Sequence, residues 1–581
     1  MLLCAAAPAG AKGSALTPPT GLQASVGARS AELRWNAAVF PAGVTPVGIV
    51  VRRDGEPLTT LPASARSFSD RRVSPGDEHA YTLQSVGSRG TTRLVSPQSK
   101  AVSISLPAYL VGAATRDISP SGTVNLGGFG LGDGSVVPEV VVGRGGTGAT
   151  KGERIAARAM VIDDGRQAIA IADIETQGMF AAYQDGRYGL ADIAAQVAKD
   201  TGMPADHILI AADHTHSGPD TIGVWGGPPP GYLAYIRDQT VAAIEAAFAA
   251  RRLADVRAGH SDASDLIYNQ SCTEALNQSK SPDYPGPDVC ATPGKDGLFR
   301  VVQATAPGAG VVVTFAAYAA HSTAGGGDGI TGAWPQYLSD AMSKTYGGVG
   351  LAMEGANGGT QPCRPACAFT KPSNPGYDID NRKQAIVANY MAHVADSLAH
   401  TTPVRGAIGA AQGRIREVIS GPAVLGLFTA GQHIGARLLR SHDNPWVVGN
   451  TISTVTSALR VGSVLFAGTP GEGFPAIGDG VRTAVTGERE VIQLGLANDQ
   501  LGYLIAPARY VPVIAAQVAV NDNIIFNVSP TIGDHVMCSD IALALKAGAA
   551  GASPATCAPY DAQDAAGDPV ASVPAGGVVL P

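Results

Sequence analysis

One segment of the chain places two histidines directly after an apolar run. Residues 207–220 read HILIAADHTHSGPD, so a strand-like run is followed by His214 and His216 and then by a Gly-Pro turn. In mixed sheets, ligands collect beyond the carboxyl ends of strands. Two histidines one residue apart present one imidazole to such a site and keep the second beside it. Alone, the pair is weak evidence for a metal site.

Three further segments have the same form, an apolar run that leads to one chemically useful side chain. They are 311–323 (VVVTFAAYAAHST) with His321, 461–473 (VGSVLFAGTPGEG) with Glu472, and 491–503 (VIQLGLANDQLGY) with Tyr503. Each has an ordinary structural reading: a satisfied core histidine, a solvated turn glutamate or a packed tyrosine. Together with the first segment they supply nitrogen and oxygen donors at the ends of separate strands. Zinc accepts such mixed ligation and keeps an open position in catalytic sites.

The surrounding patterns predict the scaffold for these side chains. Helical periodicity covers 189–200, 232–250 and 383–399. Strand-like apolar runs cover 167–173, 207–212, 310–318, 461–467 and 491–496. Because helices and strands are mixed over more than 400 residues, the pattern predicts one large mixed α/β (α+β) domain over residues 108–548.

The order of these motifs resembles the neutral, non-lysosomal ceramidase family. The matching strings are GAATRDISP (112–120), ADHTHSGPD, FAAYAAHST, GTPGEGFPAIGDGVR and LGLANDQLGYLIAPARY. HTHSGP is the most specific of them, and the others stand in the family's order within residues 108–548. The resemblance implies a zinc hydrolase that cleaves the amide bond of N-acylsphingosine.

The resemblance also implies a ligand set. The family's zinc is held by the first His of HTHSGP, a later His after an apolar strand, the Glu of PGE and a Tyr after GLxN. These positions are His214, His321, Glu472 and Tyr503 here, with the two histidines 107 residues apart. His216 matches the second His of the motif, which lies beside the metal, and we expect it to be a catalytic acid–base.

The substrate side of the family pattern is not kept. The family's serine falls at Gly355, or at Ala356 if the gap moves by one, and Thr360 is the nearest hydroxyl. The family's Asn-Arg-Ser motif appears as Asn269, Gln270 and a serine, so its cation is missing. We therefore predict a retained metal shell and a rebuilt substrate shell, with Asn269, Gln270 and Gly355 as substrate contacts. Zinc lowers the pKa of a bound water to about 7, so we expect this water to be the nucleophile.

The first part of the chain has a different character. Residues 16–107 contain alternating runs separated by Gly, Pro, Ser and Asp turns, with Trp35 on an early strand and Tyr81 in EHAYTLQSV. This pattern is similar to a fibronectin type III module, an all-β sandwich. The module has no cluster of catalytic residue types, which indicates a spacing or adhesion role.

The cysteines and the N-terminus predict an oxidising location. Apart from Cys4, six cysteines stand as three close pairs: Cys272 and Cys290, Cys363 and Cys367, Cys538 and Cys557. Local pairing is the simplest of fifteen connectivities. A structural zinc site is the rival explanation, although the chain has no CxxC.

Residues 1–15 resemble the end of a secretory signal peptide, or else are a frayed N-terminus. Residues 549–581, rich in Ala, Gly and Pro, read as a loosely held tail that Cys557 could pin.

Composition excludes several classes of protein. Of the 581 residues, 45% are hydrophobic and 15% charged, with a net charge of −7, which argues against a disordered chain and against a nucleic-acid binder. The longest apolar runs are about ten residues, too short to span a bilayer. The sequence predicts a secreted, extracellular or periplasmic, zinc-dependent amidase or esterase that acts on a lipid-like or acyl-amide small molecule.

An alternative from another class stays open. In it, the large domain is a non-catalytic zinc-containing protein that recognises a lipid or a glycan, and the front module attaches it to a membrane or cell surface. A phosphatase-like metalloenzyme would need more carboxylates for a second metal. The oligomeric state is not predicted by these patterns.

Overall fold

The chain forms two compact units, Met1–Leu110 and Val111–Pro581. The computed structural model describes residues 15–121, 124–128, 153–184, 186–225, 227–269, 296–324, 329–362, 379–420, 447–505 and 527–569. The division lies three residues beyond the predicted boundary at residue 107, within strand β9 (Tyr109–Asp117), which belongs to the sheet of the second unit. No helix in the described part of the chain is long and apolar enough to cross a membrane.

The first unit is built from two antiparallel sheets. The first has the order β1-β2-β5, formed by Gln23–Val26, Ala31–Arg34 and Ser67–Asp70. The second has the order β4-β3-β6-β7 with β8 beside β6, formed by Glu56–Leu61, Thr45–Arg53, Glu78–Arg89, Thr92–Val95 and Val102–Ser105. Trp35 and Tyr81 are both buried, and the Tyr81 hydroxyl donates to Asp70 at 2.8 Å. The unit is all-β as predicted, and its assignment to fibronectin type III stays a prediction.

A nine-stranded mixed sheet forms the core of the second unit. Its order is β12-β11-β10-β9-β13-β15-β16-β17, with β19 beside β13. Besides β9, the strands are β10 (Ala156–Asp163), β11 (Ala168–Ile174), β12 (Ile208–Ala212), β13 (Arg252–Asp262), β15 (Leu298–Ala306), β16 (Gly310–Tyr318), β17 (Val349–Glu354) and β19 (Thr402–Pro403). Strands β11 and β12 are parallel, and so are β16 and β17.

A five-stranded sheet with the order β20-β22-β23-β25 packs against the first, and β21 pairs with β22. Its strands are β20 (Ile408–Val418), β21 (Val447–Val448), β22 (Thr451–Val461), β23 (Val464–Gly468) and β25 (Glu490–Leu494). Edge-to-face contact between Phe315 of β16 and Phe466 of β23, with ring centres 5.5 Å apart, joins the two sheets. Two short ladders pair β14 with β18 and β24 with β26: Ile267–Asn269, Thr360–Pro362, Glu472–Gly473 and Tyr503–Leu504.

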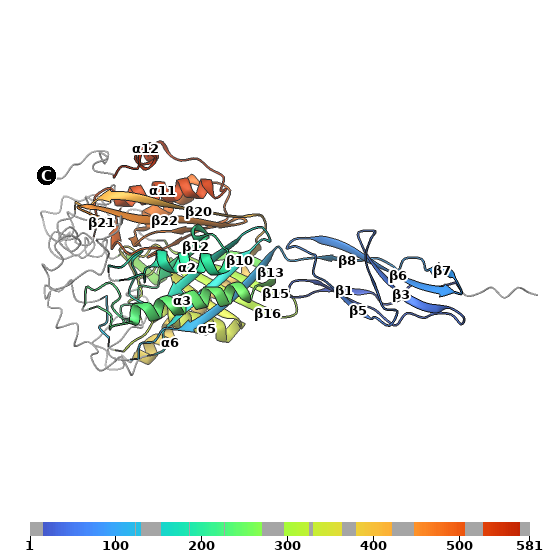
Figure 1. The fold of residues 1–581 in the computed structure, drawn as a ribbon. Coiled ribbons are helices and arrows are strands. Elements are labelled where there is room, and N and C mark those ends of the chain that lie inside the picture. The colour runs from blue at the N-terminus through green and yellow to red at the C-terminus, as the bar shows by residue number, and fades with distance from the viewer. Residues whose placement is uncertain are drawn as a thin grey trace, which may run out of the picture. The chain divides into compact units, whose positions relative to one another are not determined.

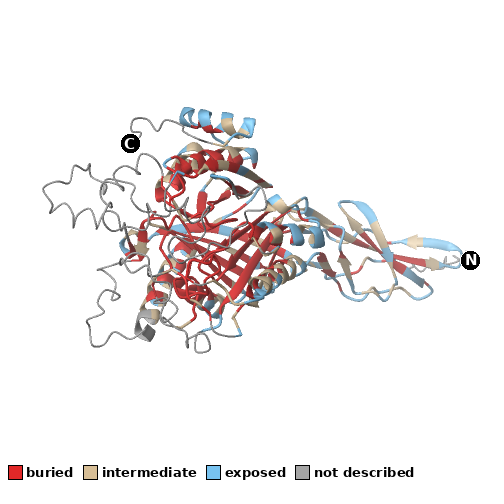
Figure 2. Cartoon of the chain, turned by 60° about the vertical axis from the view of Figure 1, so that its left-hand side comes forward, coloured by how far each residue is buried: buried red, intermediate tan, exposed pale blue. Residues whose placement is uncertain are grey.

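Helices cover the outer faces of both sheets (Figures 1 and 2). Helices α3, α5 and α6 pack on the nine-stranded sheet, α2 packs on α3, and α8, α11 and α12 gather on the five-stranded side. Their bounds are α2 Leu190–Thr201, α3 Tyr232–Ala249, α5 Ala333–Tyr346, α6 Ile379–Ala399, α8 Pro475–Ala484, α11 Ile532–Lys546 and α12 Ala558–Ala566, with 3₁₀ turns η2 Ala205–His207, η3 Ser264–Leu266 and η5 Ala555–Cys557. Strands that are covered on both faces read as continuous apolar runs, and every residue of β11 and β12 is buried.

The predicted elements of the large domain are present. The three helical patterns correspond to α2, α3 and α6, and the five strand-like runs correspond to β11, β12, β16, β23 and β25. Helix α2 shows why such a pattern is readable: the Gly189 N–H donates to Asp192 in the first turn, and Gly202 ends the helix at φ +76°. Helices α5, α8, α11 and α12 were not predicted.

The stretch that begins at residue 549 contains helix α12 in its described part. Helix α12 is tied back by a disulfide between Cys538 and Cys557, the predicted pair, with Cα atoms 5.2 Å apart. Tyr560 is buried and stacks on His535 at 5.2 Å. The disulfide agrees with the expectation that Cys557 pins this segment, and two buried side chains are enough to fix a short helix. The remaining predicted cysteines, Cys272, Cys290, Cys363 and Cys367, lie outside the described residues.

Candidate metal centre

Each of the four predicted ligands follows the carboxyl end of a strand. His214 comes two residues after β12, and His321 three residues after β16, both in the nine-stranded sheet. Glu472 follows β23 and Tyr503 follows β25, both in the five-stranded sheet. Because β24 and β26 run parallel with Glu472 opposite Tyr503, the second pair is held in register. The two sheets therefore bring two side chains each to one edge of their interface.

Hydrogen bonds to the backbone fix how two imidazoles present their nitrogens. Nδ1 of His214 lies 2.8 Å from the Gln177 carbonyl oxygen, and Nδ1 of His321 lies 2.9 Å from the Asn357 carbonyl oxygen. A carbonyl oxygen only accepts, so both Nδ1 atoms carry the proton. The two Nε2 atoms are then free to act as donors of a lone pair, the arrangement that orients metal-bound histidines.

Both Nε2 atoms face the same carboxylate oxygen. Oε2 of Glu472 lies 3.4 Å from Nε2 of His214 and 3.1 Å from Nε2 of His321. A tetrahedral shell with zinc–ligand distances near 2.0–2.1 Å would put neighbouring donor atoms about 3.3 Å apart. His321 Nε2 and Glu472 Oε2 are buried and have no hydrogen-bond partner among the described residues. Lone pairs that converge in this way fit a cation, and the N and O donor types fit zinc.

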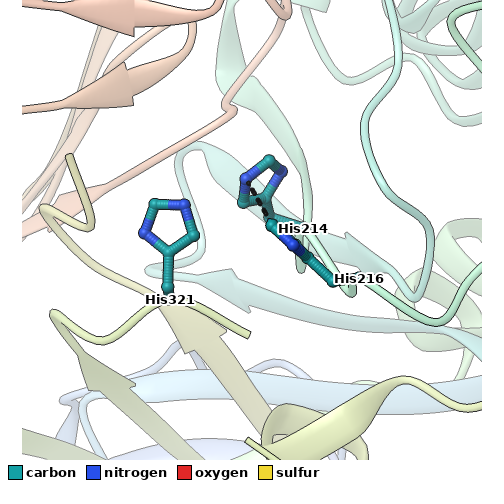
Figure 3. A group of neighbouring side chains, drawn as sticks. All are labelled: His214, His216 and His321. Atoms are coloured by element: carbon teal, nitrogen blue, oxygen red, sulfur yellow. Dashed lines mark hydrogen bonds between the residues drawn. The ribbon is translucent and has the colours of Figure 1, made fainter. Parts of the chain in front are cut away.

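His216 completes a group of three histidines (Figure 3). Its Nε2 lies 3.3 Å from Nε2 of His214, and one ring nitrogen from each of His214, His216 and His321 lies within 4.8 Å of the others, so this buried group can hold a metal ion. Gly128 packs directly on the His216 ring: a Cβ there would lie 2.4 Å from it, and φ is +101°. The geometry thus permits His216 to ligate as well as to act as the acid–base predicted from sequence.

Tyr503 lies beside the centre through its ring. The ring stacks on His321 with centres 6.2 Å apart and contacts Phe474 edge-on at 6.4 Å. Tyr503 is partly exposed, whereas His214, His321 and Glu472 are buried. Of the four predicted ligands, the structure therefore brings three together at their donor atoms and places the fourth next to them.

Backbone strain concentrates around this centre. Outside glycine, positive φ angles among the described residues occur at His214 (53°), Ala333 (51°), Leu496 (48°) and Asn498 (64°), besides Asp54 in a turn of the first unit. Leu496 and Asn498 stand in the segment that leads to Tyr503, and the Leu496 N–H bonds to the carbonyl before Glu472. Left-handed backbone costs a non-glycine residue about 1–2 kcal/mol, and such strain gathers at functional sites.

Electrostatic coupling links the centre to a buried carboxylate behind it. Burial disfavours the charged His214 ring, but the Glu472 carboxylate outweighs this and raises the pKa of His214 to about 9. Burial would raise the pKa of Glu472, yet His214 and His321 lower it below its ordinary value. Burial raises the pKa of Glu354, at the end of β17, to about 7. Without a metal, a proton between His214 Nε2 and Glu472 therefore takes the place that a cation would hold.

The predicted substrate contacts differ in how they are related to the metal centre. Asn269 ends β14 and pairs with Thr360, whose carbonyl accepts the His321 N–H at 3.1 Å. A side chain at Gly355 would point at the backbone of Ala319 and Gln493 rather than into open space. Such a Cβ would lie 3.3 Å from the Ala319 nitrogen and 3.4 Å from the Gln493 carbonyl oxygen, so position 355 is enclosed by backbone. Gln270 lies outside the described residues.

Sequence reasoning missed the residues that support the ligands. Gln177 follows β11 and Asn357 follows β17, at the same edge as the ligands, but they act through carbonyl oxygens that any residue carries. Further buried carboxylates surround them, and burial raises the pKa of Asp173 and Asp213 well above the ordinary range. The sequence signal that could have located these supporting residues is the presence of polar residues directly after apolar strands.

Comparison with solved structures identifies the fold. A crystal structure of neutral ceramidase from Pseudomonas aeruginosa matches with a TM-score of 0.56 and 17% identity, over 78% of this chain and 77% of that chain. A ceramidase complexed with C2 matches with a TM-score of 0.57 and 17% identity, over 77% of each chain. The fold is ceramidase-like. No protein-family model and no curated protein match the sequence. The similarity expected from HTHSGP and the ordered motifs is therefore confirmed at the level of fold.

Proposed function

We propose that this protein is a zinc-dependent hydrolase of the ceramidase-like group that cleaves an amide or ester bond with water as the nucleophile. The observation that carries the proposal is that His214 Nε2 and His321 Nε2 lie 3.4 Å and 3.1 Å from the same atom, Oε2 of Glu472. Each Nε2 is aimed by a backbone carbonyl on the other side of its ring. Tyr503, beside His321, is the proposed fourth ligand.

When bound there, zinc would polarise a carbonyl and lower the pKa of a coordinated water to about 7. The residues of the chain orient the ligands and transfer the proton. The carbonyls of Gln177 and Asn357 keep the proton on Nδ1 of His214 and His321. His216, 3.3 Å from His214 at Nε2, is placed to accept the proton of the attacking water and to return it to the leaving group.

The chemistry of the substrate follows from what the motifs kept and lost. Position 355 carries no hydroxyl, and the family's arginine is replaced by Gln270. We infer an acyl amide or ester of a lipid-like molecule whose head group differs from that of ceramide. Secretion is part of the proposal, and the Cys538–Cys557 disulfide supports it because disulfides persist in oxidising compartments.

A second candidate function is supported by burial. His214, His321 and Glu472 are 2%, 1% and 5% exposed, a degree of enclosure typical of structural metal sites. In this case the protein would bind a lipid or glycan without turnover. The two candidates share the metal and differ in catalysis.

One experiment separates them. Zinc content is measured by elemental analysis, and hydrolysis is screened with N-acyl amides and acyl esters, with chelator and after zinc is restored. The proposal expects about one zinc per chain and an activity that is lost with chelator and regained with zinc. Stoichiometric zinc without turnover on any panel member supports the binding protein instead. Absence of zinc, or full activity after its removal, contradicts both.

A further inference from the structure

The exposed large apolar side chains gather on the first unit. Among the described residues, the large hydrophobic side chains that are exposed are Val39 (72%), Val47 (55%) and Val95 (50%), with Tyr235 (39%) in the second unit. Single exposed hydrophobics are ordinary, but a group of them marks an interaction surface. The three valines belong to one small unit, so their mutual position decides whether they form a surface.

All three valines lie around one point of strand β6. Val95 pairs with Val86 across β6 and β7, and Val47 sits in the bulge where β3 passes Val86 and Gly87. Val39 precedes Phe40, whose ring edge lies 3.6 Å from the position of a Cβ on Gly87. The three come from separate segments, and these contacts tie each segment to the Val86–Gly87 part of β6. The β6–β7 hairpin lies at this end of the sheet (Figure 1).

This end is remote from the point where the chain leaves the first unit. The Leu106 N–H bonds to the Asp77 carbonyl, so the exit lies at the start of β6, whereas the hairpin lies at its far end. At about 3.3 Å per residue, the two ends of β6 are roughly 35 Å apart. We call Val39, Val47, Val95, Arg89 and Arg93 the tip.

Acidic side chains of the first unit lie away from the tip, at an end where arginines such as Arg53 also lie and pair with them. Arg89 and Arg93, in the hairpin, are exposed and form no salt bridge with a described residue. All six acidic side chains lie at the opposite end: Asp54 accepts from the Ala80 N–H and Asp70 from the Tyr81 hydroxyl, and the same end holds Glu32, Glu56, Asp77 and Glu78. The tip is thus positive as well as apolar.

The two units also differ in overall charge. Residues 15–110 contain ten Lys and Arg and six Asp and Glu, a net charge of +4. Residues 111–581 contain 30 basic and 42 acidic residues, a net charge of −12. An anionic partner would be attracted to the first unit and repelled by the second.

We infer that the tip is a docking surface for an anionic lipid bilayer. Exposed valines enter the headgroup region, and the two arginines pair with lipid phosphates or carboxylates at the same depth. Reversible membrane binding needs two such signals, because a small apolar contact alone is marginal. The inference does not depend on the proposed hydrolase activity, although docking would bring the second unit to a lipid-like substrate.

Vesicle co-sedimentation of the full chain tests the inference. The probes are phosphatidylcholine vesicles with and without 30% phosphatidylserine, at low and high salt. The variants are Val39→Ser/Val47→Ser/Val95→Ser and Arg89→Gln/Arg93→Gln. The control is Arg29→Gln/Arg71→Gln, which removes the same charge from exposed positions away from the tip. Because all these side chains are exposed, folding is expected to be unchanged, and circular dichroism checks this.

The parent chain is expected to bind only the anionic vesicles and to be released by salt. Each arginine near a charged surface contributes about fivefold, so Arg89→Gln/Arg93→Gln should weaken binding by more than about tenfold. The triple valine variant should weaken binding at least as much, and the control variant should weaken it by less than about twofold.

No preference for anionic vesicles, or equal loss of binding in the control, would overturn the inference. A change of oligomeric state in the valine variant would show instead that a second copy covers the tip. Zinc content and hydrolysis of a soluble amide should be unchanged in every variant, so the two proposals fail separately.

Discussion

Two buried histidines of the second unit, His214 and His535, differ in how their nitrogens are satisfied. In His535, Nδ1 lies 2.9 Å from Glu417 and Nε2 lies 3.0 Å from Asp564, so each nitrogen has its own carboxylate acceptor. In His214, Nδ1 bonds to a backbone carbonyl, and Nε2 shares its space with Glu472 and the Nε2 of His216. His535 thus belongs to a closed ion network, in which every nitrogen is paired. His214 belongs to an open centre, a group of donor atoms that point toward one common position.

Neither burial nor titration distinguishes these two centres. Both rings are buried, and nearby carboxylates outweigh burial to raise the pKa of each to about 9. The network around His535 holds α12 against α11 and β20, which is a structural task. The His214 centre differs from the His535 network because its buried acceptor atoms face one another, and a cation would satisfy them. A perturbed pKa therefore identifies a functional site only together with the partners of each nitrogen.

Replacing the histidine of the open centre should have the largest effect. His214→Ala is expected to lose zinc and to lower activity by more than about a thousandfold, because the remaining donors hold the ion far less well. Elemental analysis and the amide and ester panel measure both. The matched control is His400→Ala, since His400 is an exposed histidine beside Asp396. Stoichiometric zinc in His214→Ala would remove His214 from the ligand set.

Replacing the histidine of the closed network should affect stability instead. His535→Ala leaves Glu417 and Asp564 without their cation, and breaking a buried ion pair costs about 3–5 kcal/mol. Denaturant unfolding monitored by fluorescence should show this loss, while zinc content stays unchanged. His400→Ala should change the free energy of unfolding by less than about 0.5 kcal/mol. Loss of zinc in His535→Ala would mean that the two centres are not independent.

The same network predicts how stability depends on pH. The folded-state pKa of His535 is raised from 6.5 to about 9. Its contribution to stability is therefore fully present below about pH 6.5 and is lost as the pH rises through about 9. The difference in free energy of unfolding between the parent and His535→Ala should shrink between pH 7 and pH 10. A difference that is constant over this range would show that His535 stabilises by packing on Tyr560 and not by charge.

Within the open centre, His216 should matter less than His214. His216→Ala is expected to keep zinc and to slow turnover on the order of a hundredfold, the usual size of a general acid–base contribution. Steady-state kinetics on zinc-replete protein measure it, and the pH–rate profile should lose the limb that belongs to the base. Zinc loss in this variant would make His216 a ligand, and full activity would remove it from the mechanism.

The sequence predicted the parts of the site that depend on local pattern. His214, His321, Glu472 and Tyr503 each come after an apolar run, and the resemblance to the ceramidase family singled them out as a ligand set. The Cys538–Cys557 pair followed from spacing alone, and it is confirmed. Local pattern also gave the all-β character of the first unit and the mixed character of the second.

The remaining features depend on contacts between distant residues. The carbonyls of Gln177 and Asn357 fix the two ligand rings, yet a carbonyl has no sequence signature. Position 355 looked like a lost catalytic position, but its packing on Ala319 and Gln493 appears only in three dimensions. Helix α12 was missed because its order comes from the disulfide and from Tyr560 on His535, not from its own periodicity.

Anomalous diffraction from crystals grown with zinc, recorded on both sides of the zinc absorption edge, tests the central claim most directly. The account predicts one strong peak bounded by Nε2 of His214, Nε2 of His321 and Oε2 of Glu472, about 2.0–2.2 Å from each atom. The same map would show whether the Tyr503 hydroxyl or His216 is the fourth donor. An empty centre with zinc present, or zinc bound only at other residues, would contradict the account.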